Sequence, residues 1–313
     1  MSILAALTLR LKRNSTTAAY SRIAVSRLRT MLLRLSPELF AKRRYKMMVG
    51  RALDLDHTET FDEKLLWLML YWRHPLKSQC GDKYSMRAYV TEHGWERILP
   101  SLAGVYEKSS DIDFDALPEK FVLKCTHGWG FNIICKNKAL LDREETRRKL
   151  DEWMAADMST YFGEIHYASM KHRIICEHYL DDLTGDEPID YKLYCFDGKV
   201  HCTLVCQQRS TLHGHPLADF YDRTWTSKLP YSKASSIADR SLPKPGAYDE
   251  MVAAAEALSK PFPFVRMDFY NIQGRAILGE MTFTPNACID PDYPDDAQRF
   301  LGSLITLPAR FPS

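Results

Sequence analysis

The stretch Val265-Arg266-Met267-Asp268-Phe269-Tyr270 is followed by the turn Asn271-Ile272-Gln273-Gly274 and by Arg275-Ala276-Ile277-Leu278-Gly279-Glu280-Met281-Thr282-Phe283. Two largely apolar runs around an Asn-x-x-Gly turn predict a β-hairpin. Asp268 and Glu280 then lie on neighbouring strands, where acids are disfavoured. We therefore expect both carboxylates to face one pocket, and paired oxygen ligands of this kind suit Mg²⁺. The alternative is that Asp268 only pairs with Arg266 at the surface.

The charge of the chain is distributed unevenly. Residues 1–50 contain 11 Lys/Arg and one acid, whereas the rest of the 313 residues contain 31 Lys/Arg and 39 Asp/Glu. This asymmetry indicates a basic arm that contacts a polyanion or a membrane surface, and it argues against a nucleic-acid-binding body. The length is sufficient for two or three subdomains around a sizeable core.

Cysteine usage and hydropathy predict a cytoplasmic protein. The eight cysteines are scattered, with no C-x-x-C pair and no histidine spacing typical of zinc, so we interpret them as reduced core residues. The apolar runs are shorter than the roughly 18–20 residues that a membrane span needs. The N-terminus lacks the apolar core of a secretory signal.

A second glycine-containing turn lies in the middle of the chain. The run Phe121-Val122-Leu123-Lys124-Cys125 leads through Thr126-His127-Gly128-Trp129-Gly130-Phe131-Asn132 into Ile133-Ile134-Cys135. Glycines between two strands let backbone N–H groups approach phosphate closely, and Lys124 can reach the same oxygens. The turn is not a Walker A loop, because no Gly-Lys-Ser/Thr opens a helix. Alternatively, Lys124 only blocks extension of a sheet edge, and His127 is an ordinary turn residue.

Capping and turn signals locate further elements. Thr60 and Glu63 form a capping box before an apolar helix that ends ahead of Pro75, and Asp82 is expected to open a second helix. Asp197-Gly198 between two strand-like runs predicts another hairpin. Further expectations from the pattern are a strand at 174–176, helices at 144–158 and 248–259, and a mobile loop at 210–247. Strands interspersed with helices predict an α+β class with largely antiparallel sheets.

The order of these motifs resembles the ATP-grasp superfamily, and specifically its TupA-like branch, named for teichuronopeptide biosynthesis. The resemblance covers roughly residues 52–285. It is carried by Thr60-Phe61-Asp62-Glu63-Lys64, Asp82-Lys83-Tyr84, Leu117-Pro118 with the Lys124 strand, Asp190-Tyr191-Lys192 with Phe196-Asp197-Gly198-Lys199, Phe262-Pro263-Phe264-Val265-Arg266-Met267-Asp268, and Gly279-Glu280-Met281-Thr282-Phe283.

The resemblance implies an ATP-grasp fold, in which two α+β lobes with antiparallel sheets clamp a nucleotide behind a helical N-terminal region. The implied divisions are a basic amphipathic arm (1–50), a helical region (51–118), an N-lobe (119–188) and a C-lobe with the metal site (189–313).

The resemblance also implies roles for individual residues. ATP would be bound by Lys83, Lys124, His127, Gly128, Gly130, Glu177 and Asp182, and Mg²⁺ by Asp268 and Glu280. The implied catalytic residues are Lys192, Arg209 and Arg266, of which the first two would hold the γ-phosphate or an acyl-phosphate. One departure concerns the position two residues after Glu280, where many ATP-grasp enzymes have Asn. Here it is Thr282, and the nearest Asn is Asn286.

The leading functional hypothesis is a carboxylate–amine ligase that forms an amide through an acyl-phosphate. Such chemistry needs charge neutralisation by lysines, arginine and Mg²⁺ rather than a protein nucleophile. The family name implies that a small amine or amino acid is joined to a uronic acid of a cell-surface polysaccharide, a carboxylate-bearing glycan. The alternatives are a phosphotransferase with the same nucleotide site and a non-catalytic nucleotide-binding module. Two metal carboxylates argue against the last.

Residues 1–50 generate a prediction of their own, because parts of this arm alternate leucines with arginines as a basic amphipathic helix does. We expect the arm to hold the protein on anionic membranes, with about 1 kcal/mol per basic residue near the surface, lost as salt rises. Flotation with anionic liposomes compares full-length and truncated protein. Equal binding by the two would mean that the arm is a structural helix packed on the body by its leucines.

Overall fold

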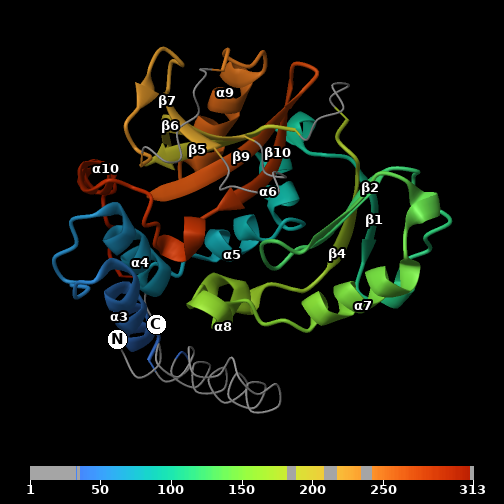
Figure 1. Ribbon diagram of the computed structural model, residues 1–313, viewed down its shortest axis with the longest axis horizontal. Coiled ribbons are helices and arrows are strands. Elements are labelled where there is room, and N and C mark those ends of the chain that lie inside the picture. The colour runs from blue at the N-terminus through green and yellow to red at the C-terminus, as the bar shows by residue number, and fades with distance from the viewer. Residues whose placement is uncertain (1–32, 34–35, 182–187, 208–216, 234–241, 311–313) are drawn as a thin grey trace.

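The computed structural model describes residues 33, 36–181, 188–207, 217–233 and 242–310. Two antiparallel sheets dominate it (Figure 1). The large sheet has the strand order β10-β9-β5-β6-β7-β8, and the small sheet has the order β1-β4-β2-β3. The predicted α+β class with antiparallel sheets is therefore confirmed. Most of the basic arm lies outside the described residues.

The bounds of the elements are as follows. The small sheet contains β1 (Leu102–Tyr106), β2 (Phe121–Cys125), β3 (Asn132–Cys135) and β4 (Ile174–His178). The large sheet contains β5 (Asp190–Phe196), β6 (Lys199–Gln207), β7 (Leu217–Asp222), β8 (Lys228–Leu229), β9 (Phe264–Ile272) and β10 (Arg275–Thr282). The α-helices are α3 (Pro37–Val49), α4 (Phe61–Tyr71), α5 (Pro75–Gly81), α6 (Met86–Glu92), α7 (Arg143–Met154), α8 (Ser159–Phe162), α9 (Tyr248–Ser259) and α10 (Asp295–Ser303).

The hairpin predicted from the opening stretch is formed by β9 and β10. Its strands pair up to Ile272 and Arg275, so the turn consists of Gln273 and Gly274 alone. Both turn residues have positive φ, 52° and 76°, which is the geometry whose twist matches paired strands. Nearer the other end, the register shifts between Leu278 and Glu280. This β-bulge sets Glu280 directly opposite Asp268.

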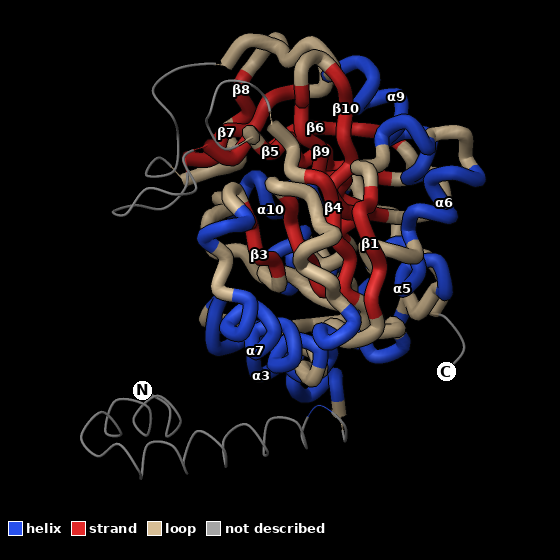
Figure 2. The backbone as a smooth tube through the Cα atoms, turned by 90° about the vertical axis from the view of Figure 1, so that its right-hand side faces the viewer, coloured by secondary structure: helices blue, strands red, loops and turns tan. Residues whose placement is uncertain are grey.

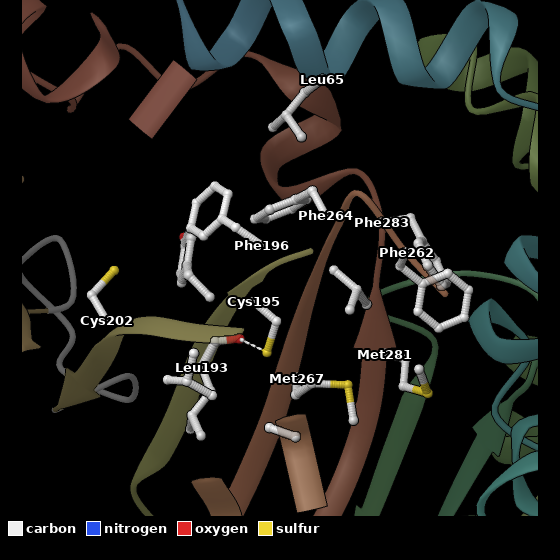
Figure 3. Close-up of a cluster of buried hydrophobic side chains, with 14 of the residues drawn as sticks. Leu65, Leu193, Cys195, Phe196, Cys202, Phe262, Phe264, Met267, Met281 and Phe283 are labelled. Atoms are coloured by element: carbon white, nitrogen blue, oxygen red, sulfur yellow. Dashed lines mark hydrogen bonds between the residues drawn. The ribbon is translucent and has the colours of Figure 1, made fainter. Parts of the chain in front are cut away.

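Helices cover both faces of the large sheet. Phe61 at the start of α4 packs against Tyr194, Phe196 and Phe264, with ring centroids 5.1–6.2 Å apart. Side chains alternate between the faces of a strand, so Cys195 points the other way, toward Ser259 of α9. Figure 3 shows this core, with Phe196 and Phe264 close to each other and the Cys195 thiol directed at the Leu193 carbonyl.

The small sheet has a hydrophobic core of its own. Figure 2 shows β1 and β4 side by side with α7 near the sheet. Leu150 of α7 and Phe121, Leu123 and Cys176 of the sheet belong to one buried cluster, separate from the cluster of the large sheet. All eight cysteines are unpaired, and seven of them are buried. These buried positions confirm the interpretation of the cysteines as core residues.

Two helix predictions around Pro75 have different outcomes. The capping box of α4 is present, and Glu63 accepts a hydrogen bond from the backbone N–H of Thr60 at 3.0 Å. The second predicted helix is found as α6, but it begins at Met86 rather than at Asp82. The Asp82 carboxylate instead accepts backbone hydrogen bonds from Tyr84 and Ser85 and stabilises a turn. The helices predicted at 144–158 and 248–259 are found as α7 and α9.

The loop predicted at 210–247 was wrong in part, because it contains β7 and β8. The buried Asp219 of β7 pairs with Lys228 of β8 at 3.0 Å. An acid inside a strand, satisfied by a lysine nine residues later, hides the apolar alternation by which strands are recognised. The small-sheet strand β1 lies within the segment predicted to be helical. The strand is short and contains Gly104, and both features weaken the strand pattern in the sequence there.

Helix α3 limits what the basic arm can do. Ser36 caps this helix, and its buried residues are Ala41, Arg44 and Tyr45. Tyr45 donates a hydrogen bond to Glu63 of α4 at 3.0 Å. This part of residues 1–50 is therefore packed on the body, and a truncation that tests membrane contact is best placed before Ser36. Within the described ranges, no helix has the length and hydropathy to cross a bilayer.

A glycine contact between α10 and α4 generates a stability prediction. A Cβ at Gly302 would lie 2.3 Å from the Glu59 carbonyl oxygen and 2.7 Å from the Thr60 carbonyl carbon. We expect Gly302→Ala to destabilise the protein by about 1–3 kcal/mol through overpacking, although alanine favours a helix by about 1 kcal/mol. Chemical denaturation measures the change, with Ser303→Ala on the exposed face as control. A more stable Gly302→Ala protein would contradict the predicted close contact.

Candidate active site

Both sheets contribute to one cavity, which we call the central cavity. Its volume is about 240 Å³. The small sheet contributes Lys124 and the turn between β2 and β3, and the large sheet contributes β5, β9 and β10. The lining residues are Lys83, Lys124, Trp129, Gly130, Phe131, Asn132, Asp190, Lys192, Asp268, Tyr270, Gly279 and Glu280.

A row of charged residues crosses three strands at the base of this cavity. Lys192 of β5 is opposite Asp268 of β9, which is opposite Glu280 of β10. Directly opposed residues share a face of the sheet, so all three side chains point the same way. The Lys192 Nζ lies 2.5 Å from Asp268 Oδ2. Lys192 also lies 3.3 Å from Asp190, two residues earlier on its strand.

Arg266 holds the central carboxylate of the row. It precedes Asp268 by two residues and therefore lies on the same face of β9. Its guanidinium donates two hydrogen bonds of 2.7 Å to the two oxygens of Asp268, the bidentate geometry that gives the strongest pairs. Burial would lower the pKa of Arg266, but Asp268 raises it well above its usual range. The pair expected as an alternative for Asp268 thus exists, but it is buried and lies at the cavity.

Glu280 is held ionised by the cations around it. Burial alone would raise the pKa of this carboxyl, but Lys83, Lys192 and Arg266 lower it far below the usual range. The Thr282 hydroxyl donates to Glu280 at 3.2 Å. Thr282 occupies the position where many ATP-grasp enzymes have Asn. Its hydrogen bond orients the Glu280 carboxylate.

Two lysines complete the cavity. Lys83 donates to the Gly128 carbonyl at 2.6 Å and lies 3.2 Å from Glu280, so it connects the β2–β3 turn to the large sheet. Lys124 lies 2.6 Å from Glu177 on the neighbouring strand β4. Every cation named here therefore contacts a carboxylate. A ligand that carries both phosphate anions and a divalent cation can exchange with these pairs without leaving a buried charge unpaired.

The donor set fits Mg²⁺. Asp268 and Glu280 supply hard oxygen ligands from paired strands, and Mg²⁺ is usually held by one or two carboxylates together with substrate phosphates. In the part of the chain that the structure describes, no group of three or more His, Cys, Asp or Glu is arranged to hold a metal unaided. The two acids therefore fit a metal that arrives with a phosphate ligand.

The structure brings most of the predicted site residues together. Lys83, Lys124, Gly130, Lys192, Asp268 and Glu280 line the central cavity. Glu177 reaches it through Lys124, Gly128 through its carbonyl, and Arg266 through Asp268. Asp182 and Arg209 lie outside the described residues, so their roles stay predictions.

His127, which was predicted to bind ATP, does not line the central cavity. Its side chain is fully buried away from the cavity, stacked on His172 with ring centroids 3.5 Å apart and with Nε2 3.1 Å from the Trp153 carbonyl oxygen. Burial lowers the pKa of His127 to about 4, and His172 adds to the effect. The role of His127 in nucleotide binding stays a prediction. The contribution of His127 is to anchor the β2–β3 turn.

Sequence reasoning missed several residues of the site. Asp190 lies opposite Tyr270 on β9, and both line the cavity. Asp190 interrupts an apolar run as Asp268 does, so the same criterion could have found it. Glu164 is buried and accepts hydrogen bonds from Trp129 at 3.3 Å and from Thr284 at 2.5 Å. Burial raises the pKa of Glu164. No signal in the sequence marks this residue.

Two antiparallel sheets that enclose a cavity of lysines and paired acids define the ATP-grasp class of proteins. The model of the TupA-like ATP-grasp family matches residues 63–306, and the chain belongs to this family. The resemblance inferred from the motifs is thereby confirmed. A comparison with curated proteins finds no match.

A comparison with solved structures finds ATP-grasp ligases at low sequence identity. D-alanine–D-alanine ligase from Bacillus anthracis matches at 16% identity over 66% of this chain, with a TM-score of 0.39. The chain spans 57% of the length of that ligase. D-cycloserine synthetase DcsG matches at 16% identity over 74% of this chain and 71% of its own, with a TM-score of 0.41. The ATP-grasp ligase PsnB, solved with its minimal precursor, Mg and ADP, matches at 15% identity with a TM-score of 0.38. The match covers 77% of this chain and 64% of PsnB.

We expect substitutions of Glu280 and of Lys124, on the two sheets that line the cavity, to have different effects. Glu280→Gln keeps the side-chain volume but removes a charge, so we expect turnover to fall at least ~100-fold while most affinity for Mg·ATP remains. Lys124→Ala removes a cation, so we expect the dissociation constant for Mg·ATP to rise ~10-fold or more. Calorimetric titration with Mg·ATP measures affinity, and ADP release with D-glucuronate and hydroxylamine measures turnover.

Lys136→Ala, on an exposed lysine just beyond β3, is the matched control for Lys124→Ala. Circular dichroism establishes that each variant is folded. A fully active Glu280→Gln enzyme would end the assignment of this carboxylate to the metal.

Proposed function

We propose that the protein is an ATP-dependent carboxylate–amine ligase that forms ADP and a C–N bond. The observation that carries this proposal is the row Lys192, Asp268 and Glu280, which offers a cation and two adjacent carboxylates on one face of the sheet. Membership of a family of ATP-grasp proteins supports it. ATP is the proposed nucleotide and Mg²⁺ the proposed metal.

In the proposed reaction, a carboxylate oxygen of the substrate attacks the γ-phosphorus of ATP. The bond from that phosphorus to the β-phosphate oxygen breaks, and ADP leaves. The amine lone pair then attacks the acyl-phosphate carbon, inorganic phosphate departs with the C–O electron pair, and the nitrogen loses a proton. Asp268 and Glu280 would hold Mg²⁺, which would supply charge neutralisation of the phosphates.

The residues of the chain would orient and neutralise the reactants. Lys124 would hold phosphates from the small sheet, and Lys83 would hold them from the opposite side, next to Glu280. Lys192 would contact the transferred phosphoryl group, where a fixed cation stabilises developing negative charge. Arg266 would keep Asp268 in place by its two hydrogen bonds, so its role is positioning. Gly130 lets the turn backbone approach the phosphates because its φ is +75°.

The proposed substrates are a uronic acid of a cell-surface polysaccharide and an amino acid or small amine. Cationic side chains near the site support an acidic acceptor. We also propose a cytoplasmic location with peripheral membrane contact through the residues that precede α3. A lipid-linked acidic glycan at an anionic leaflet would be reached from there, and the charge of +10 on residues 1–50 favours this surface.

The second candidate is a phosphotransferase that passes the γ-phosphate to a stable acceptor. It would use the same lysines and the same pair of acids, because the two reactions differ only after phosphoryl transfer. A trapping experiment separates them. An acyl-phosphate reacts with hydroxylamine to give a hydroxamate, whereas a phosphate ester does not.

We expect the protein, with Mg·ATP, D-glucuronate and hydroxylamine, to produce hydroxamate together with equal amounts of ADP and inorganic phosphate. Lys192→Met is expected to lower hydroxamate formation by at least ~100-fold, because a cation at the transferred phosphoryl group is lost. Colorimetric hydroxamate detection and coupled ADP measurement give the stoichiometry. Lys199→Met, on an exposed lysine at the start of β6, is the control. Accumulation of a stable phosphorylated product without hydroxamate would replace the ligase by the phosphotransferase.

A further inference from the structure

A second cavity adjoins the central cavity. Its volume is about 410 Å³, and it shares Lys83, Trp129 and Glu280 with the central cavity. The two cavities therefore meet at these three residues. Its size lies in the range of about 300–1,000 Å³ that is typical of small-molecule sites.

One wall of the second cavity is a turn with an unusual backbone. Asn286, Ala287 and Cys288 follow one another with φ of 48°, 50° and 70°. Left-handed backbone is costly for residues other than glycine, and three in succession persist only where surrounding structure holds them. Asn286 and Ala287 line the cavity. Strained backbone of this kind is concentrated at ligand sites.

Arg44 of α3 holds this turn from outside the family-matched region. Its Nη1 donates to the Ala287 carbonyl at 2.5 Å, and its Nη2 donates to the Asn286 carbonyl at 3.4 Å. The guanidinium also lies 5.1 Å from the centre of the Phe162 ring. Arg44 is only 7% exposed, so this contact is shielded from water. The two ends of the contact are separated by more than 240 residues of chain.

The chemistry of the lining defines the ligand class. Trp129, Phe162 and Tyr167 provide aromatic faces, and Arg44, Lys83 and Arg266 provide positive charge. The acids of the lining are Glu164 and Glu280, and burial raises the pKa of Glu164. Aromatic faces favour a flat or ring-shaped apolar surface, whereas the cations favour an anion. The anion also has to react with the phosphoryl group. Because the two cavities adjoin at Lys83 and Glu280, the anion would approach the phosphoryl group there.

We propose that the second cavity binds the acceptor as a carboxylate carried on a ring, and that Arg44 is a positioning residue that fixes the Asn286–Cys288 turn as its wall. This inference rests on the proposed ligase function for the identity of the reacting group. It adds that α3 is part of the acceptor site. Acceptor specificity therefore depends on a helix that precedes the family-matched residues 63–306.

The test uses full-length protein with Mg·ADP and titrates D-glucuronate, with D-glucose as the same ring without a carboxylate. We expect D-glucuronate to bind at least tenfold more tightly than D-glucose. Arg44→Met should weaken D-glucuronate binding at least tenfold and leave the dissociation constant for Mg·ADP within twofold. Arg44→Lys, which retains one donor and the charge, should recover part of the affinity. Arg43→Met, on an exposed residue of the same helix, should behave as wild type.

Ala287→Gly provides a variant that does not risk the fold. Glycine adopts the left-handed conformation without strain, so its melting temperature should be equal to or above that of wild type. The looser turn should still weaken D-glucuronate binding about threefold or more. The proposal is supported if Arg44→Met and Ala287→Gly both lose affinity for D-glucuronate while their affinity for Mg·ADP is unchanged.

Three outcomes have separate meanings. Equal binding of D-glucuronate and D-glucose, or no binding of either, overturns the ligand class. Wild-type affinity in Ala287→Gly and in folded Arg44→Met overturns the role of the turn. If D-glucuronate binds as expected but no hydroxamate forms with ATP and hydroxylamine, the proposed ligase function fails while the acceptor cavity stands.

Discussion

The site depends on one extra residue in β10. Without the bulge at Gly279, continued pairing from Leu278 and Phe269 would set Gly279 opposite Asp268 and turn Glu280 toward the face of Met267, which is buried in the core. A shift of one residue moves every following side chain to the other face of the sheet. Glycine suits the position, since a Cβ there would lie 3.0 Å from the Tyr270 ring. The row of three charges exists because the strand is irregular there.

Charges in this row are stable only as a set. A buried ion that loses its partner costs several kcal/mol, which is far more than an exposed pair contributes. Lys192, Arg266 and Lys83 each contact Asp268 or Glu280, so the protein without ligand has already oriented the groups that phosphates and metal would need. The Asn286–Cys288 turn is arranged similarly, with about 1–2 kcal/mol of strain per residue offset by hydrogen bonds to Arg44.

The sequence predicted those features of the fold that are determined by interactions between residues close together in the chain. The β9–β10 hairpin, the hairpin at Asp197-Gly198 and the capping box of α4 follow from neighbouring residues, and so does the placement of Asp268 and Glu280 on neighbouring strands. Their direct opposition requires the bulge, which no pattern in the sequence predicted. The remainder depends on distant partners. Glu164 contacts Thr284 across 120 residues, and strand β7 is stabilised by pairing with β6 rather than by its own composition. No motif records the burial of His127 against His172 either.

The separate hydrophobic clusters of the two sheets affect how the molecule fluctuates. A body with its own core can rotate or open as a unit, because such a movement breaks the interactions across the boundary and preserves those inside the core. Lys83 spans this boundary, from the Gly128 carbonyl to Glu280, and water can replace polar interactions of this kind at little cost. The small sheet and α7 can therefore move together as one rigid unit relative to the large sheet. Ligand affinity would then include the free energy of this closing movement.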